Sequence, residues 1–183
     1  GVDAPDEPPC EQHHLPCLYN IPLRDCSGLS AGGAQTTAEY TAWIDAIAGA
    51  IGSRDAVVML EPDGLALMPM DCGQDPTGSL TAERFDQLRY AIQALKALSN
   101  TRVYLDAGHS NWHSVGAIAS RLVQAGVADT QGFYLNPSNY QPTAQQIQYG
   151  TWISKCIAFA ADPSEGGWRL GHYDFCASQY FPA

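Results

Sequence analysis

Short apolar runs alternate with longer amphipathic segments along most of the chain. Four of these runs, each about five residues long, are rich in Val, Leu, Ile and aromatic residues, which predicts β-strands. The predicted strands span residues 17–21, 56–60, 102–106 and 132–136. Because the runs are apolar at nearly every position, we expect both faces of their sheet to be covered.

The segments between these runs repeat apolar residues at helical spacing. They predict helices over residues 36–52, 80–99, 114–127 and 143–159. Thr36 and Glu39 have the spacing of a capping box at the start of the first helix. Thr143 and Gln146 repeat that spacing at the last helix, and Thr81 is expected to cap the second.

Four successive strand–helix units predict an α/β fold with a parallel sheet, built either as a barrel or as an open sheet. Residues 1–16 are rich in Pro, Asp and Glu, and residues 162–183 in Gly, Pro and aromatic residues, so both segments are expected to be irregular. Residues 1–183 are therefore predicted to form a single domain. No GxGxxG or GxxxxGK[ST] motif is present, which disfavours nucleotide binding.

Charge and cysteine content narrow the functional class. The net charge of −10 argues against a nucleic-acid partner, because phosphate binding needs clustered Lys and Arg. No apolar run approaches the roughly 20 residues that cross a bilayer, so no membrane partner is expected. Six cysteines, an even number, favour disulfides and a secreted, extracellular protein.

Polar and aromatic residues follow each predicted strand. The carboxyl ends of parallel strands meet at one rim, so these residues should gather there. They are Tyr19, Asn20, Arg24 and Asp25; Glu61 and Asp63; Asp106, His109 and Trp112; and Asn136, Asn139 and Tyr140. Any one of them could be a helix cap or a turn former, but four clusters on one rim indicate a site. Carboxylates beside aromatic rings and amides suit a carbohydrate, and glycoside cleavage needs an acid of raised pKa.

Four motifs between Leu18 and Tyr149 carry a family resemblance: LYNIPLRDC, VVMLEPDGLALM, VYLDAGHSNWHS and GFYLNPSNYQPTAQQIQYG. In order and spacing the chain resembles glycoside hydrolase family 6, the endoglucanases and cellobiohydrolases that cut β-1,4-glucan with inversion. Bacterial members are the most similar. The resemblance implies a distorted β/α barrel with parallel strands, no cofactor and no metal. It implies cellulose or cello-oligosaccharides as the partner.

The resemblance also implies two catalytic carboxyl groups. The EPD motif makes Asp63 the general acid, and its apolar surroundings should keep it protonated near neutral pH. The RDC motif makes Asp25 the partner carboxylate, whose negative charge should raise the pKa of the acid. The alternatives are a turn cap for Asp63 and an ion pair with Arg24 for Asp25. Glu61 is expected to be structural.

Further residues are expected to contact or support the sugar. Tyr19 should crowd the ring at the cleavage point, Trp112 should be a platform, and Asn139 should hydrogen-bond hydroxyl groups. The full predicted set is Tyr19, Arg24, Asp106, His109, Trp112, Asn136 and Asn139. A buried, satisfied histidine is the alternative for His109, and a core aromatic is the alternative for Trp112.

The chain departs from the family pattern in three places. The family's early barrel segment is missing before Leu18, and the Lys-Pro-Gly-Glu-type segment associated with the catalytic base is missing before Ala183. The serine that commonly follows the RDC motif has no clean match, Ser30 being the nearest. The identity of the base is therefore open. The barrel is expected to be incomplete if the chain is a fragment, and a processed form or a minimal variant are the alternatives. Open sheet edges are expected to permit oligomerisation.

The resemblance implies a disulfide between Cys26 and Cys72 that joins two rim loops. Cys156 and Cys176 bracket the C-terminal segment and could pair likewise. The remaining two cysteines lie in CEQHHLPC at residues 10–17.

This segment, with Cys10, His13, His14 and Cys17, has ligand types that zinc binds. A disulfide is the favoured interpretation, because adjacent histidines rarely point at one ion and an oxidising compartment favours cystine.

The sequence is best interpreted as a secreted endo-β-1,4-glucanase. The short, Gly-rich loop at residues 25–36 favours endo action, because exo-acting members cover their site with long loops. Cellobiohydrolase-type exo action remains an alternative, since residues 71–79 and the tail from residue 162 could enclose the cleft. A carbohydrate-binding protein that lacks its catalytic base and a zinc-organised interaction domain are the two remaining hypotheses.

Overall fold

The computed structural model describes residues 15–176. Four parallel strands form one sheet in the order β1-β2-β3-β4. The strands are β1 (Cys17–Leu18), β2 (Ala56–Leu60), β3 (Thr101–Asp106) and β4 (Gly132–Tyr134). They alternate with helices α1 (Thr37–Ile51), α2 (Ser79–Lys96), α3 (Val115–Gln124) and α4 (Thr143–Ala160). The predicted α/β fold with parallel strands is confirmed.

The strand order shows how the sheet is wound. Each strand pairs with its neighbour in the sequence, so the chain advances in one direction, as in a β/α barrel and unlike a doubly wound sheet. The register aligns Leu18 with Leu60, Leu60 with Leu105, and Leu105 with Phe133. The carboxyl ends of all four strands therefore lie at a common rim.

One face of the sheet is covered more fully than the other. In β2, Ala56, Val58 and Leu60 are buried, whereas Val57 and Met59 are only half-buried. Val58 and Leu60 belong to the same core cluster as residues of α1 and α2. The expectation that both faces would be covered is wrong for residues 15–176, because within this range the helices bury one face and leave the other partly open.

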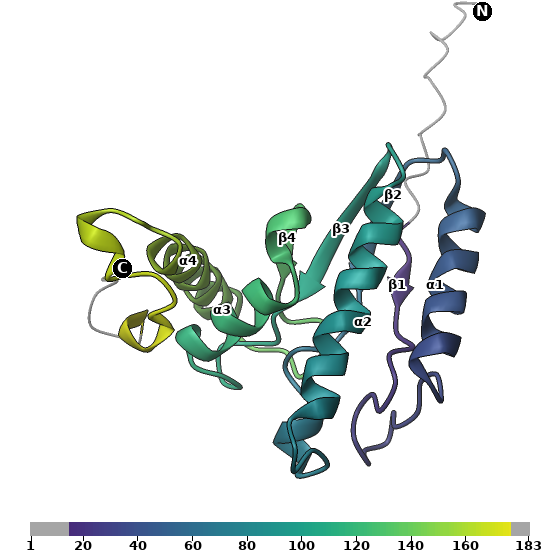
Figure 1. Cartoon of the computed structure of the whole chain (residues 1–183), viewed down its shortest axis with the longest axis horizontal. Helices are drawn as coiled ribbons and strands as arrows, with labels where there is room; N and C mark the ends of the chain where they lie inside the picture. Colours follow the sequence, from purple (N-terminus) through teal and green to yellow (C-terminus); the bar gives the residue numbers. More distant parts are fainter. Residues whose placement is uncertain (1–14, 177–183) are drawn as a thin grey trace, which may run out of the picture.

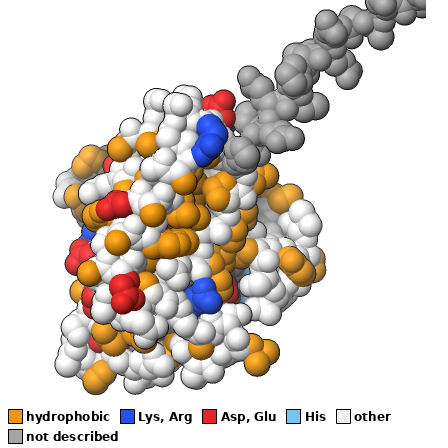
Figure 2. All heavy atoms as spheres, turned by 90° about the vertical axis from the view of Figure 1, so that its right-hand side faces the viewer, with side chains coloured by type: hydrophobic (Ala, Val, Ile, Leu, Met, Phe, Trp, Pro, Cys, Tyr) orange, Lys and Arg blue, Asp and Glu red, His pale blue; other side chains and the backbone are white. Residues whose placement is uncertain are grey.

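The helices form two pairs at opposite ends of the strand layer, α1 against α2 and α3 against α4 (Figure 1). Seen from the α1 side, hydrophobic side chains gather over the middle of the surface, with charged groups scattered around them (Figure 2). On α1, Ala42, Ala46 and Ala50 are exposed and Trp43 is half-buried against the core.

Oligomerisation through the β1 or β4 edge stays a prediction.

Two strands are shorter than predicted. The first ends at Leu18 instead of residue 21, because the backbone N–H groups of Asn20 and Ile21 donate to the Glu61 carboxylate and not to a strand. The last ends at Tyr134 instead of residue 136. In both cases the chain leaves the sheet where the site residues begin.

The helix starts were predicted with mixed success. Thr36 does cap α1, since its hydroxyl accepts from the backbone N–H of Glu39 at 3.1 Å. Thr81 does not cap α2, which begins at Ser79. The expected capping box at Thr143 is also wrong, because the Gln146 side chain donates to Ser110 instead.

The cap of α2 comes from further back in the chain than predicted. The carboxylate of Asp75 accepts from the backbone N–H groups of Leu80 and Thr81, at 3.2 and 2.7 Å. These are orphan donors of the first helical turn, which a carboxylate satisfies well.

Short 3-10 helices complete the described chain: η1 (Pro69–Cys72), η2 (Val127–Asp129), η3 (Glu165–Gly167) and η4 (Tyr173–Cys176). The last two lie in the segment predicted to be irregular. A disulfide between Cys156 and Cys176 ties η4 to α4.

Of the cysteine–histidine segment at residues 10–17, only residues 15–17 fall within the described chain. Cys10, His13 and His14 lie outside the described residues, and Cys17 has no disulfide partner within residues 15–176. Among the described helices, none has the length and apolar character needed to cross a membrane.

Two helical glycines should respond oppositely to the same substitution. A Cβ on Gly116 in α3 would overlap the backbone carbonyl of Tyr173, whereas a Cβ on Gly49 in α1 meets no atom within 4 Å. We expect Gly116→Ala to lower the free energy of unfolding by about 1–3 kcal/mol through overpacking. Gly49→Ala should raise it by about 0.5–1 kcal/mol. Urea unfolding measures both, and equal effects would contradict the packing of η4 on α3.

Candidate active site

A buried glutamate connects the ends of the first two strands. Glu61 follows β2 and is 1% exposed. Its carboxylate accepts from the backbone N–H groups of Asn20 and Ile21, each at 3.0 Å. Burial raises the pKa of Glu61 to about 7, although these backbone donors act in the opposite direction. Glu61 thus fastens the loop after β1 to the end of β2, in keeping with its expected structural role.

A buried aspartate makes the equivalent connection one strand further along. Asp106 ends β3, is 1% exposed and accepts from the backbone N–H of Asp63 at 2.6 Å. It also accepts from the N–H of Gly108 at 2.9 Å. Burial raises the pKa of Asp106 to about 7. Its position under the loop of Asp63 makes it a support for that loop.

The third connection joins the last two strands through the backbone. The N–H of Asn136 donates to the carbonyl of Gly108 at 2.8 Å. The Asn136 side chain donates to the carbonyl of Gln141 and accepts from its N–H, which closes the loop after β4. Both ends of this amide are therefore used within the loop. Asn139, in contrast, is exposed, and its side chain makes no hydrogen bond within residues 15–176.

Asp63 occupies the centre of this rim. It has a left-handed backbone conformation with φ of 61°, and its side chain is half-buried. Burial raises the pKa of the Asp63 carboxyl, and the negative charge of Asp25 raises it further. A hydroxyl contact from Ser138 at 3.5 Å and the nearby His109 act in the opposite direction. The net effect is a pKa of Asp63 above the usual range for aspartate, which favours the protonated form.

A tight turn holds Asp25. The backbone N–H of Ser30 donates to the Asp25 carboxylate at 2.7 Å, and Asp25 has φ of 52°. A Cβ on Gly28 would overlap this carboxylate, so a larger side chain at that position would displace the carboxylate from its place in the turn. The Asp25 carboxylate is therefore fixed by its own loop.

Arg24 and Tyr19 pack together beside this turn. The Arg24 guanidinium lies over the Tyr19 ring, 4.6 Å from its centroid, and donates to the carbonyls of Tyr19 and Ser30. Burial raises the pKa of the Tyr19 hydroxyl, and the charges of Asp63 and Asp25 raise it further. Tyr19 therefore lies within the field of both predicted catalytic carboxyl groups.

The segment after β3 carries three aromatic rings that pack against one another. The ring centroids of His109 and Trp112 are 5.3 Å apart, and the Trp112 ring stacks on His113 at 6.0 Å and 12°. His109 is 9% exposed and accepts from the N–H of Asn111 through Nδ1. The structure thus gathers the residues expected at the rim, while their contacts with sugar stay predictions.

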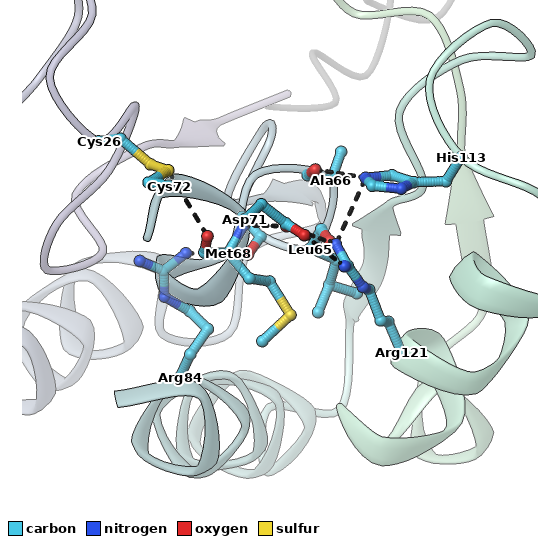
Figure 3. A network of polar contacts seen from close by, with 10 residues as sticks. Cys26, Leu65, Ala66, Met68, Asp71, Cys72, Arg84, His113 and Arg121 are labelled. Atoms are coloured by element: carbon cyan, nitrogen blue, oxygen red, sulfur yellow. Dashed lines mark hydrogen bonds and ion pairs between the residues drawn. A yellow bond between two sulfur atoms is a disulfide. The ribbon is translucent and has the colours of Figure 1, made fainter. Parts of the chain in front are cut away.

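Arg121 and His113 hold the loop that carries Asp63. Arg121 from α3 forms an ion pair with Asp71 at 2.7 Å and donates to the carbonyl of Leu65 (Figure 3). His113 contacts the carbonyl of Ala66 at 2.6 Å in the same network (Figure 3). These contacts hold the segment between Asp63 and η1.

Arg84 and a disulfide join this loop to the loop of Asp25. Arg84 of α2 is 1% exposed and donates to the carbonyls of Gly64 and Pro22, at 2.9 and 2.6 Å. The implied disulfide between Cys26 and Cys72 is present and bridges the same two loops (Figure 3). Two independent links therefore set the spacing of the loops that carry Asp25 and Asp63.

Arg84, Arg121 and Ser138 are among the contributors that were not predicted. Arg84 and Arg121 lie in amphipathic helix sequences, where a basic residue is normally expected to be exposed to solvent. Ser138 stands next to Asn139 in the PSNY stretch, so its position was visible but its contact with Asp63 was not.

Residues 15–176 contain no group of three or more His, Cys, Asp and Glu side chains that could hold a metal ion. The side chains placed at the rim carry carboxyl groups, amides and aromatic rings.

Comparison with known proteins shows the family of the chain. Residues 6–165 match the model of glycosyl hydrolases family 6. The chain belongs to this family.

Its relatives include several endoglucanases. Endoglucanase A of Cellulomonas fimi is 40% identical over 153 residues, which cover 82% of this chain and 32% of the relative. Endoglucanase 1 of Streptomyces halstedii is 38% identical over 164 residues, which cover 84% of this chain and 50% of the relative.

A solved endoglucanase structure is similar to the chain in both fold and sequence. The endoglucanase Cel6 from Mycobacterium tuberculosis, in complex with methyl-cellobiosyl-4-deoxy-4-thio-β-D-cellobioside, has a TM-score of 0.73 and 42% sequence identity. The match covers 79% of this chain and 47% of that chain. The chain thus spans half or less of the length of these relatives.

Removing the titratable group at position 61 should flatten the pH dependence of stability. Because the pKa of Glu61 rises from 4.5 to about 7 on folding, the folded chain binds this proton more tightly than the unfolded chain. The free energy of unfolding should therefore fall as the pH rises from 4.5 to about 7. Glu61→Gln keeps an acceptor oxygen but cannot titrate, so this fall should shrink by at most about 3 kcal/mol.

Urea unfolding at a series of pH values measures this slope. Asp129→Asn changes an exposed carboxylate and should keep the parent slope. An unchanged slope in Glu61→Gln would show that Glu61 does not bind its proton more tightly in the folded chain.

Proposed function

We propose that the chain contributes the catalytic acid and part of the sugar-binding cleft of an enzyme that hydrolyses internal β-1,4-glucosidic bonds with inversion. Asp63 is the general acid that protonates the leaving oxygen, and Asp25 is its partner carboxylate. The observation that carries this proposal is the half-buried Asp63 carboxyl, which has a raised pKa and lies on the rim beside Asp25. A group that donates a proton near neutral pH needs these properties.

The surroundings of Asp63 support this assignment. The backbone N–H of Asp63 is held by the Asp106 carboxylate, so its side chain starts from a fixed point. Ser138 contacts one carboxyl oxygen at 3.5 Å and can follow the group through its change of charge. A turn cap would need the carboxylate to accept from nearby backbone N–H groups, and within residues 15–176 the Asp63 carboxylate accepts none.

The other rim residues suit a glucan chain. Trp112 offers an aromatic surface, Asn139 a free amide, and Tyr19 a ring near both carboxyl groups. Sugar binding by Arg24, Asp106, His109 and Asn136 belongs to the same proposal, although Asn136 and Asp106 also hold loops. Sugar recognition combines stacking faces with neutral hydrogen-bonding groups, and the rim provides both.

Endo action and secretion complete the proposal. The relatives named above are endoglucanases, and the loop of residues 25–36 is held close to the rim by the contacts of Arg24 with Ser30 and Gly32. The two disulfides suit an oxidising, extracellular location.

The test is release of reducing sugar from carboxymethyl cellulose by the chain and by Asp63→Asn. The substitution removes the donated proton with little change of shape, so the rate should fall about 10²- to 10⁴-fold. Asp129→Asn, at an exposed carboxylate, should keep the parent rate.

Activity that survives in Asp63→Asn would contradict the role of Asp63. A parent chain that binds β-glucan without releasing sugar would favour a carbohydrate-binding protein. Release of cellobiose alone, without a fall in viscosity, would favour exo action.

A further inference from the structure

A polar pocket lies outside the rim site, between the segment after β3 and helix α4. Its volume is about 410 Å³. Asn111, His113 and Ser114 line one side, and Gln145, Gln148 and Trp152 line the other. No role in the proposed reaction accounts for this pocket.

Three of its side chains form a stripe along α4. Gln145, Gln148 and Trp152 are spaced three and four residues apart, which places them on one face of the helix. Both glutamines are exposed and Trp152 is half-buried. None of the three side chains makes a hydrogen bond or ring contact within residues 15–176, so two amides and one indole N–H are available to a ligand.

The chemistry of the pocket selects for a neutral, polyhydroxylated ligand. Its lining includes no Asp, Glu, Lys or Arg, and the imidazole of His113 contacts the carbonyl of Ala66, so the pocket offers a charged ligand no fixed opposite charge. Amides and hydroxyls provide both donors and acceptors, and an indole offers an apolar face with a polar edge. This combination is suited to a sugar ring.

The pocket borders the rim site directly. His113 lines the pocket, and its ring stacks on Trp112, whose other neighbour is His109. Asn111 also lines the pocket, and its side chain donates at 2.7 Å to Gln141, in the loop after β4. The segment at residues 109–113 therefore faces the rim site on one side and the pocket on the other.

We propose that this pocket is a distal glucan-binding site, which holds part of a long chain away from the point of cleavage. Trp152 provides the stacking surface, and Gln145 and Gln148 bind hydroxyl groups. The identity of the sugar rests on the proposed function. Because the site lies beyond the cleft, it should matter for polymers and not for short substrates.

The test separates polymer binding from cleavage. Native gels containing soluble mixed-linkage β-glucan measure polymer affinity, and the hydrolysis of cellotetraose measures the rim site. Trp152→Ala should weaken polymer binding at least fivefold and change kcat/KM for cellotetraose by less than twofold.

Two further variants guard against misfolding and non-specific effects. Gln145→Ala combined with Gln148→Ala alters only exposed side chains and should also weaken polymer binding, with thermal unfolding unchanged. Trp168→Ala removes an indole that is 46% exposed and lies outside the pocket, and it should bind like the parent.

The outcomes distinguish the two proposals. Parent-like polymer binding by both pocket variants would overturn the distal site, while continued cellotetraose hydrolysis would leave the proposed function standing. Weaker polymer binding in Trp168→Ala alone would also overturn it. A parent chain that neither cleaves cellotetraose nor binds the polymer would contradict the proposed function and the distal site together.

Discussion

Buried carboxylates that accept backbone N–H groups from the neighbouring loop hold this rim together. Glu61 fastens the loop after β1, and Asp106 fastens the loop that carries Asp63. A buried carboxylate deprived of its donors costs several kcal/mol, so neither loop can move away without a large penalty. The strand ends at the rim are thereby linked in a chain of contacts that ends with the Asn136 N–H on the Gly108 carbonyl.

The second of these supports, Asp106, fixes the loop that carries a third carboxyl group, that of Asp63, the proposed proton donor. Asp63 has its backbone fixed, its side chain half-buried and the charge of Asp25 nearby. Arg84 and the Cys26–Cys72 disulfide keep the loops of the two aspartates together. Rigid supports of this kind preorganise a proton donor, because the site need not rearrange when charge develops.

The sequence predicted the alternation of strands and helices and the gathering of polar residues at one rim, since both follow from periodicity. The expectation that Asp63 is the catalytic acid came from the family resemblance and not from periodicity, because Glu61 and Asp63 flank the same proline and differ only in where the backbone points them. Tertiary contacts also overrode local signals, as where Gln146 bonds Ser110 instead of capping α4. The role of Arg84 depends on two carbonyls that lie far from it in the sequence.

The proposed chemistry depends on a fold that keeps the Asp63 carboxyl protonated above the usual range for aspartate. Carboxyl ¹³C NMR titration of the chain measures this property without any substrate, with the Asp63 signal assigned by its loss in Asp63→Asn. We expect Asp63 to titrate above the ordinary aspartate value of about 3.9, and its pKa to fall in Asp25→Asn. A pKa at or below that ordinary value would contradict the role of Asp63 as a proton donor.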